Sequence, residues 1–287
     1  MSGRSESDIE WNGASTTGVR EVLVVGGGVA GLTAALFTAR AGLDTLVVNH
    51  GESILRRNAH LENFPGFPAG VNPRLFADML EAQTTRNGVD HRTGRVAGLE
   101  HFESADGEGD GASGDDASGP GFVATVGSAE GDDTHEVAAE RVVVASWSDV
   151  DYLDGLDVDL REAGSKTYVD EDGFGRTSVA GLYVAGRSAE RYHQAIVSAG
   201  HGAEVGITLV HDSETPFYHD WVTPEGYFTD RGREVPPGCE EVSETERRAR
   251  ERESMAAMRE YFSELHAERQ RTHPSLVEDE VGRVEEE

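Results

Sequence analysis

Lysine, cysteine and long apolar runs are almost missing from this 287-residue chain. Its 25 basic residues are all arginine except Lys166, and 54 acidic residues give a net charge of −29. A chain this negative, with only short basic runs interleaved with glutamate, is unsuited to binding a nucleic-acid backbone or an anionic membrane surface. The single cysteine, Cys239, excludes an intramolecular disulfide framework and a CxxC redox pair.

No stretch of 18 apolar residues occurs, so the sequence predicts no membrane-spanning helix. Residues 1–19 are polar and lack an apolar core, which argues against a secretory signal and predicts a disordered leader. Because we find no signal for export, we expect a cytoplasmic protein.

The acidity of the chain has two explanations. High net charge with little apolar content produces disorder. Alternatively, a folded protein adapted to molar salt carries many surface carboxylates, because the screening length there falls to roughly 3 Å and repulsion between acids costs little. Hydrophobic residues make up 37% of the chain and lie in periodic segments, which favours a folded protein. The composition resembles that of cytosolic proteins from halophilic archaea.

A glycine-rich turn follows the first apolar segment. Residues 21–25 form a continuous apolar run, typical of a strand buried in a parallel sheet. Residues 29–41 are rich in Ala and Leu and predict a helix that closes at Gly42. Residues 45–48 predict a second buried strand. Strand, glycine turn, helix and strand within about thirty residues form a βαβ unit.

The glycines of that turn have the spacing Gly26-x-Gly28-x-x-Gly31. Between a buried strand and a helix, this spacing is the fingerprint of a dinucleotide site. Gly26 permits a tight turn, Gly28 lets the backbone approach a diphosphate, and Gly31 lets helix and strand pack closely. The free N–H groups at the helix start then attract phosphates without any lysine. A glycine turn before an ordinary core helix is the alternative.

An acidic residue is expected at the end of the second strand to bind the ribose hydroxyls. Asn49 stands there instead. Asparagine both donates and accepts hydrogen bonds, so ribose binding is one prediction for Asn49, and the start of a turn is the other.

The remaining segments complete the predicted architecture. A helix starting at Asn72-Pro73 is followed by strands over 89–145, which an acidic low-complexity loop at 103–120 interrupts. A second strand–turn–helix segment spans 167–210. We therefore predict an α/β fold: a doubly wound, Rossmann-like FAD/NAD(P)-binding domain at 20–210, with a small antiparallel inserted sheet and a helical C-terminal tail.

The predicted C-terminal extension, residues 211–287, contains a long charged helix at 243–271. Ser243 and Glu246 have the spacing of a capping box, and favourable i,i+4 ion pairs follow. A narrow apolar stripe on this helix predicts docking on the main domain, on a partner, or on a second copy of the chain; it contains Met255, Met258, Phe262 and Leu265. The aromatic residues before the helix are expected to cover the core instead of lining a substrate site; they include Trp221, Tyr227 and Phe228.

Four segments together resemble the FAD-binding part of the thioredoxin reductase family. They are 26–32 (GGGVAGL), 61–68 (LENFPGFP), 177–186 (TSVAGLYVAG) and 194–200 (QAIVSAG). The second is similar to the family's ENxPG element near the flavin, and the last two to its C-terminal FAD signature. The resemblance implies FAD as cofactor and covers roughly residues 21–210.

The sequence departs from the family in three places. The family carries a second nucleotide-binding domain with its own glycine fingerprint and a CxxC, but here only about twenty residues separate Trp147 from Thr167. The family's ATG strand end is Ala145-Ser146-Trp147, and Arg187 replaces the Asp of its Gly-Asp pair. Disulfide reduction by the family's mechanism is therefore not expected, and Arg187 either pairs with phosphate through its planar fork or disrupts the flavin site.

The resemblance also implies which residues hold the cofactor. Gly26, Gly28 and Gly31 would bind the diphosphate, and Asn49 the ribose. Asn63 would lie near the flavin ring. The ribityl chain and the pyrimidine edge would meet Gly186, Arg187, Gln194 and Ala195.

No catalytic residue is assigned by sequence. His193, at the start of the helix in the segment 167–210, is a weak candidate for a proton donor. His60 is a weak candidate for contact with cofactor or substrate. Ordinary structural roles are the alternative for both. The histidines lack metal-ligand spacing, so no metal site is predicted.

The leading functional hypothesis is an FAD-dependent oxidoreductase whose substrate and electron donor are unidentified. The two donors considered are NAD(P)H, binding transiently at the flavin face, and a small redox protein. One alternative is a redox-inactive nucleotide-binding or partner-binding protein on the same scaffold. The other is an oxidoreductase that binds NAD at the glycine turn.

Overall fold

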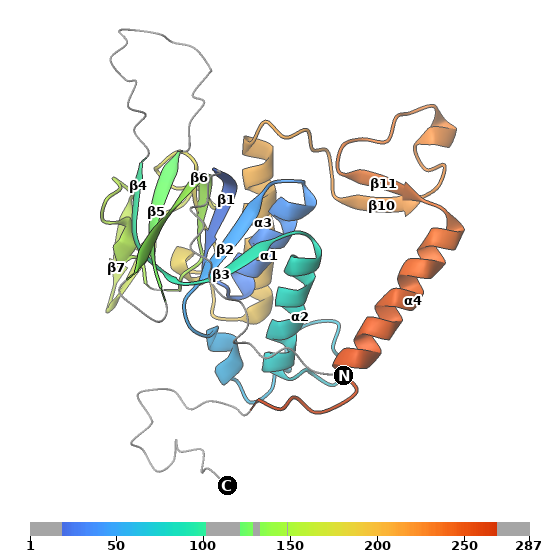
Figure 1. Cartoon of the computed structure of the whole chain (residues 1–287), viewed down its shortest axis with the longest axis horizontal. Helices are drawn as coiled ribbons and strands as arrows, with labels where there is room; N and C mark the ends of the chain where they lie inside the picture. The colour runs from blue at the N-terminus through green and yellow to red at the C-terminus, as the bar shows by residue number, and fades with distance from the viewer. Residues whose placement is uncertain (1–18, 102–120, 129–132, 148, 269–287) are drawn as a thin grey trace.

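The computed structural model describes residues 19–101, 121–128, 133–147 and 149–268, arranged around one central sheet (Figure 1). The predicted acidic loop at 103–120, and the predicted leader except residue 19, lie outside the described residues. Within the described part of the chain, no helix combines the length and apolar character needed to cross a bilayer.

Parallel strands form the centre of the sheet, in the order β3-β2-β1-β6-β9. The predicted strand–turn–helix–strand unit is therefore confirmed, with β1 and β2 as neighbours. The bounds of the five strands are β1 (Arg20–Val25), β2 (Thr45–Asn49), β3 (Asp90–Thr93), β6 (Thr134–Val144) and β9 (Leu182–Val184).

Strand β6 also carries the predicted antiparallel insert. Its first half pairs with β5 (Phe122–Gly127), which pairs in turn with β4 (Arg95–His101). Its second half pairs with β1 and β9. Strand β6 lies within the predicted strand region 89–145. Its early residues lack a continuous apolar run, because the buried Val137 and Ala139 alternate with more exposed residues. A separate hairpin follows, made of β7 (Leu160–Ala163) and β8 (Lys166–Val169).

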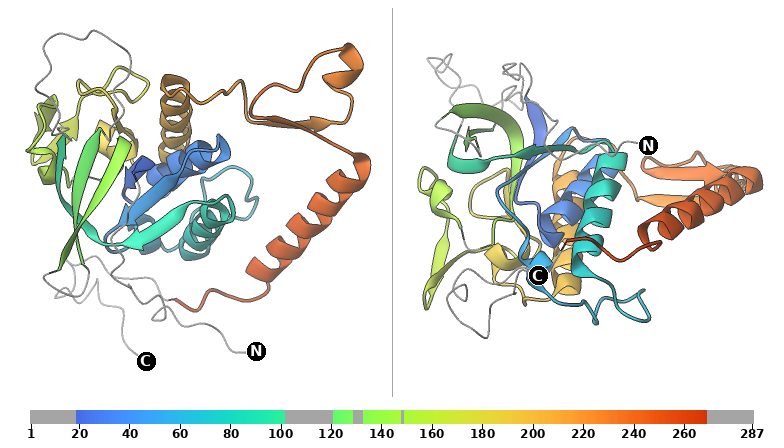
Figure 2. Two further views of the ribbon diagram at one scale, coloured as in Figure 1. Left: turned by 45° about the horizontal axis from the view of Figure 1, so that its top comes forward. Right: turned by 60° about the horizontal axis from the view of Figure 1, so that its bottom comes forward.

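Three helices cover one side of the parallel sheet, while the antiparallel strands lie on the other (Figure 2). They are α1 (Val29–Arg40), α2 (Pro73–Arg86) and α3 (Ala195–Asp212). Alternate strand residues explain the two layers, since successive side chains point to opposite faces. Val22 and Val24 pack with the helices, whereas Leu23 and Val25 pack with the antiparallel strands.

Two glycines bring α3 into close contact with α1. A Cβ atom built on Gly202 would lie 2.2 Å from the carbonyl oxygen of Ala30, and one on Gly206 would lie 2.9 Å from that of Ala34. Real Cβ atoms do not approach so closely, so any larger residue would push the helices apart. This contact fixes the start of α3 beside the start of α1.

The C-terminal extension contains a parallel strand pair that the sequence did not predict, β10 (Trp221–Pro224) and β11 (Cys239–Val242). Helix α4 (Glu244–Tyr261) follows, with Ser243 capping it as predicted: the Ser243 Oγ accepts from the N–H of Glu246. The predicted aromatic residues pack on one another here, with ring centroids 4.8–6.1 Å apart.

Helix α4 ends at Tyr261, ten residues before the end predicted at 271. The residues after Tyr261 make tertiary contacts instead of continuing the helix. The Phe262 ring packs 6.4 Å from that of Phe67. Beyond it, His266 Nε2 lies 2.8 Å from Asp78, and Arg56 pairs with Glu268 at 2.8 Å. Residues 262–268 thus turn back onto the segment around α2.

Most of the contacts that hold α4 are ionic. Glu253 pairs with Arg86 of α2 at 2.6 Å, and Arg250 pairs with Glu240 of β11 at 2.5 Å. No α4 residue is buried, and Met255 is 53% exposed. The predicted apolar stripe is therefore left largely open to solvent.

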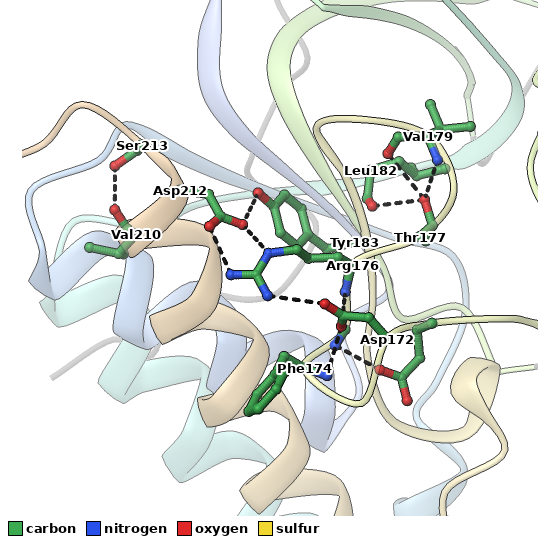
Figure 3. Close-up of polar contacts among 12 residues, drawn as sticks. Asp172, Phe174, Arg176, Thr177, Val179, Leu182, Tyr183, Val210, Asp212 and Ser213 are labelled. Carbon is green, nitrogen blue, oxygen red and sulfur yellow. Dashed lines mark hydrogen bonds and ion pairs between the residues drawn. The ribbon is translucent and has the colours of Figure 1, made fainter.

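A network of charged groups fixes the loop before β9 to the end of α3 (Figure 3). Arg176 donates two hydrogen bonds to Asp212, at 2.6 and 2.8 Å, and a third to Asp172 at 3.1 Å. The Tyr183 hydroxyl donates to Asp212 at 3.0 Å. The hydrogen bond from Arg176 is the main cause that lowers the pKa of Asp212 below its ordinary value of 3.8.

We expect Asp212→Asn to lower the free energy of unfolding at neutral pH by up to about 1 kcal/mol, because it removes a partly exposed ion pair. Since the folded-state pKa of Asp212 is depressed, its contribution is full above pH 3.8 and is lost as pH falls through the lower folded value. Urea unfolding at neutral and acidic pH should therefore show a difference that shrinks with acidification. The exposed Glu214→Gln is the control, and an equal loss in both variants would contradict the prediction.

Candidate functional site

A cavity of about 680 Å³ opens beyond the carboxyl ends of β1, β2 and β6. In parallel α/β sheets, ligands bind in this position, and the volume lies within the range of about 300–1,000 Å³ typical of ligand sites. The loops after these strands line it, through Gly26, Asn49 and Ser146.

The glycine turn shapes the floor of this cavity. Gly26 has φ +117°, and a Cβ there would lie 2.4 Å from the Ala145 carbonyl oxygen. A Cβ on Gly31 would lie 2.0 Å from the Gly26 carbonyl oxygen. On Gly28, the nearest described atom within 4 Å would be the Ser53 Oγ, at 3.8 Å. Packing thus requires Gly26 and Gly31, whereas Gly28 faces open space through which a ligand could approach.

Two helices start at the cavity. Gly28, Val29 and Ala30 line it at the start of α1, and Gln194 and Ala195 line it at the start of α3. Among the described residues, no side chain caps either start. Free N–H groups and the positive end of each helix dipole therefore face the same space, an arrangement that attracts anions.

Asn49 contacts the glycine turn directly. Its Oδ1 accepts from the N–H of Gly27 at 3.0 Å, and its Nδ2 donates to the Gly51 carbonyl at 2.9 Å. The side chain lines the cavity, but these bonds give it a turn-stabilising role beside the predicted ribose contact.

The two halves of the predicted flavin site meet through one hydrogen bond. Asn63 Nδ2 donates to Gln194 Oε1 at 2.6 Å, although 131 residues separate them. Both line the cavity. The structure therefore brings together the LENFPGFP segment and the start of α3, as the resemblance implied.

Gly186 lies at the back of the site, outside the lining residues, with φ +70°. Its N–H donates to His201 Nδ1 of α3 at 2.9 Å. His201 is 5% exposed, and among the described residues its Nε2 has no hydrogen-bond partner. Burial, and then the nearby Arg191 guanidinium, lower the pKa of His201 to about 4. The sequence gave no signal for this contact, since only the fold pairs the two residues.

His201→Leu should weaken FAD binding by about tenfold, because the Gly186 N–H loses its acceptor, while His201→Asn should restore most of the affinity through its Oδ1. Neutral His201 stabilises the fold fully above pH 6.5 and less as pH falls towards 4. Both variants should lack that acid-dependent loss. FAD titrations and unfolding at several pH values measure these effects; equal affinities for the Leu and Asn variants would contradict the positioning role.

Trp147 closes one wall of the cavity in a backbone conformation that bulky residues rarely adopt, φ +67°. The fully buried Ser188 donates from its Oγ to the Trp147 carbonyl at 2.8 Å. The indole ring meets the His193 ring edge-on, with centroids 4.4 Å apart. A positive φ in a bulky residue is strained, and such strain is typical of functional sites. A glycine at position 147 would adopt this backbone conformation without that strain.

Arg187 lines the cavity but bonds to neutral groups. Its guanidinium donates to the Tyr168 hydroxyl at 2.5 Å and to the Arg191 carbonyl at 3.2 Å. The predicted phosphate contact therefore stays a prediction.

Both weak catalytic candidates line the cavity. His60 Nδ1 lies 2.7 Å from Glu62, and the His60 side chain is 44% exposed. Burial, and then the charges of Arg187 and Lys166, lower the pKa of His193. In residues 19–268, apart from the gaps, no three His, Cys, Asp or Glu residues could hold a metal ion together.

Residues 21–59 match the family model of the FAD binding domain. Since this segment forms β1, the glycine turn, α1 and β2, the match falls on the part that faces the cavity. This segment is therefore similar to an FAD-binding domain, which supports the prediction of FAD as cofactor.

Two relatives match a part of this chain. The thioredoxin reductase of Listeria monocytogenes is 42% identical over 69 residues, 23% of this chain and 22% of that protein. The thioredoxin reductase of Streptomyces coelicolor is 42% identical over 76 residues, 25% of this chain and 23% of that protein. The matched segment spans less than a quarter of these relatives. Over the matched part, the chain is thioredoxin reductase-like, as the resemblance implied.

Solved structures show the same fold at low identity. A thioredoxin reductase from Gloeobacter violaceus superposes with a TM-score of 0.52 at 15% identity, covering 70% of this chain and 99% of that chain. An oxidoreductase from Agrobacterium tumefaciens gives 0.54 at 14% identity, covering 68% and 98%. The predicted fold class is confirmed.

Proposed function

We propose that this protein is an FAD-dependent oxidoreductase of thioredoxin reductase-like type. The observation that carries this proposal is the meeting of the glycine turn and the start of α3 at one cavity, joined by the Asn63–Gln194 bond. FAD, when bound, supplies the hydride and electron chemistry, and the chain supplies binding and orientation.

The residues of the cavity fit this cofactor. The N–H groups at the start of α1 would hold the diphosphate, and the open side of Gly28 leaves room for it. The start of α3 would stabilise negative charge at the other end of the cofactor. Buried Leu61 and half-buried Trp147 on the walls would exclude water.

Identifying the bound molecule tests this proposal. Protein purified in molar salt should release FAD, identified by mass, and should regain flavin absorbance when FAD is added back. NADPH, NADH and a chemical reductant are then offered in turn, and bleaching of the flavin absorbance reports electron transfer. Release of NAD, or a protein that stays colourless with added FAD, would contradict the proposal. FAD that binds but is reduced by no donor would favour a redox-inactive role.

We also propose that the protein works in a salt-rich cytoplasm. Its net charge of −29 supports this, because repulsion among surface carboxylates decreases as salt screens them. The free energy of unfolding should rise from low to molar KCl, and a protein equally stable in both would argue against the proposal.

A second candidate function is partner binding through α4. Met255 and Met258, 53% and 38% exposed, form part of an apolar face that the described residues leave largely open. Sedimentation of the full chain, compared with a Met255→Glu variant, tests this: a smaller assembly in the variant supports it, and identical monomers contradict it.

A further inference from the structure

Two cations at the edge of the cavity pair with no described carboxylate, Lys166 and Arg187. Arg187 bonds only to the Tyr168 hydroxyl and the Arg191 carbonyl, and Lys166 Nζ lies 5.7 Å from the centre of the Trp147 ring. Three described carboxylates of this region pair with other arginines. Asp170 and Glu190 pair with Arg161, and Glu171 pairs with Arg191. Among the described residues, therefore, no carboxylate forms an ion pair with either positive charge.

The β7–β8 hairpin places these groups together. Lys166 and Tyr168 are two residues apart on β8, so both side chains lie on the same face. On that face, Lys166 approaches Trp147, and the Arg187 guanidinium lies 4.9 Å from the centre of the Tyr168 ring. The hairpin belongs to the segment in which this chain departs from the family, and it carries the only lysine of the sequence.

Arg187 lines the cavity itself, and Lys166 lies beside its wall, over the Trp147 ring. Trp147, His193 and Arg187 line it, and the rings of Trp147 and His193 are in contact. Burial, and then the charges of Arg187 and Lys166, lower the pKa of His193. Two cations and two aromatic rings therefore form this corner.

The corner is separate from the groups that face the cofactor's diphosphate. The glycine turn and the start of α1 would hold that diphosphate. Arg187 is instead held towards the hairpin by Tyr168 and the Arg191 carbonyl. An anion that enters this corner would be attracted by both cations. An arginine fork together with a lysine suits carboxylate and phosphate oxygens.

We propose that Lys166, Arg187 and the Trp147 ring bind the anionic group, a carboxylate or a phosphate, of the second molecule that reacts at the FAD site. This inference rests on the proposed function. The Trp147 ring supplies a flat surface for the body of that molecule. The anion comes either from a nicotinamide dinucleotide donor, through its phosphates, or from a carboxylate substrate.

Titration of the FAD-loaded protein tests the proposal. Flavin absorbance first establishes that FAD is bound. NADP⁺ and benzoate are then added separately at constant salt, and tryptophan fluorescence and flavin absorbance follow binding. We expect Lys166→Gln and Arg187→Gln each to weaken binding of at least one probe by about tenfold, and Lys166→Gln to leave FAD affinity unchanged. Arg187→Lys should recover part of the loss, and the exposed Arg259→Gln on α4 is the matched control.

Each outcome of these titrations either supports or overturns the proposal. Loss of NADP⁺ binding alone supports a dinucleotide donor, and loss of benzoate binding alone supports a carboxylate substrate. The proposal is overturned if neither probe binds the FAD-loaded protein, or if both variants bind as the wild type does. It is also overturned if Arg187→Gln loses FAD to the same degree, since the cation would then belong to the cofactor. Failure to load FAD at the first step contradicts the proposed function instead.

Discussion

Gly28→Ala is expected to weaken FAD binding by roughly 10- to 150-fold, the loss of one to two hydrogen bonds to a charged group. The added methyl enters the open side of the turn, where only the Ser53 Oγ is near, at 3.8 Å. The fold of the FAD-free protein should therefore be unaffected. Absorbance titration with FAD and thermal unfolding without FAD measure the two effects separately.

Gly31→Ala provides the comparison. Its methyl would meet the Gly26 carbonyl oxygen at 2.0 Å, so this variant should lose stability even without FAD. If Gly28→Ala binds FAD as the wild type does, the diphosphate does not approach this side of the turn. If Gly28→Ala is as unstable as Gly31→Ala, the open space beside Gly28 is filled in solution.

Gly202→Ala should separate α3 from α1, because the new methyl would lie 2.2 Å from the Ala30 carbonyl oxygen. Overpacking of this kind costs about 1–3 kcal/mol. For a domain of this size, that lowers the melting temperature by roughly 2–12 °C. FAD affinity should fall as well, since the starts of both helices face the cofactor cavity. Calorimetry and FAD titration are the measurements.

Gly200→Ala is the matched control on the same helix. No described atom lies within 4 Å of its Cβ position, and it is exposed. Because alanine favours helix over glycine, this variant should gain up to about 1 kcal/mol and keep its FAD affinity. Equal stability of the two variants would show that α1 and α3 do not need the close contact at Gly202.

The opening βαβ unit could be predicted from sequence because its signals are local. An apolar run, three spaced glycines and an Ala-rich helix follow one another directly. The start of α2 was equally accessible, since Asn72 caps it by accepting from the N–H groups of Arg74 and Leu75. Each of these signals depends on residues fewer than about five positions apart.

Contacts between distant segments could not be predicted in the same way. The hydrogen bond from Gly186 to His201, and the pairing of β10 with β11, depend on how the chain folds back on itself. For Trp147, the sequence showed an unusual residue at the strand end but not its left-handed backbone. The resemblance predicted that Asn63 and Gln194 share a site, yet their bond became visible only in the structure.

Helix α4 buries no side chain of its own, and ion pairs at Glu253 and Arg250 hold its body. Its outward surface can therefore change without altering the packing of the sheet. Substitutions on that surface are limited by the balance of charges, whereas substitutions where α1 and α3 pack together are limited by side-chain volume. For engineering, α4 is accordingly the position where a label, a tag or a grafted binding epitope would disturb the flavin domain least.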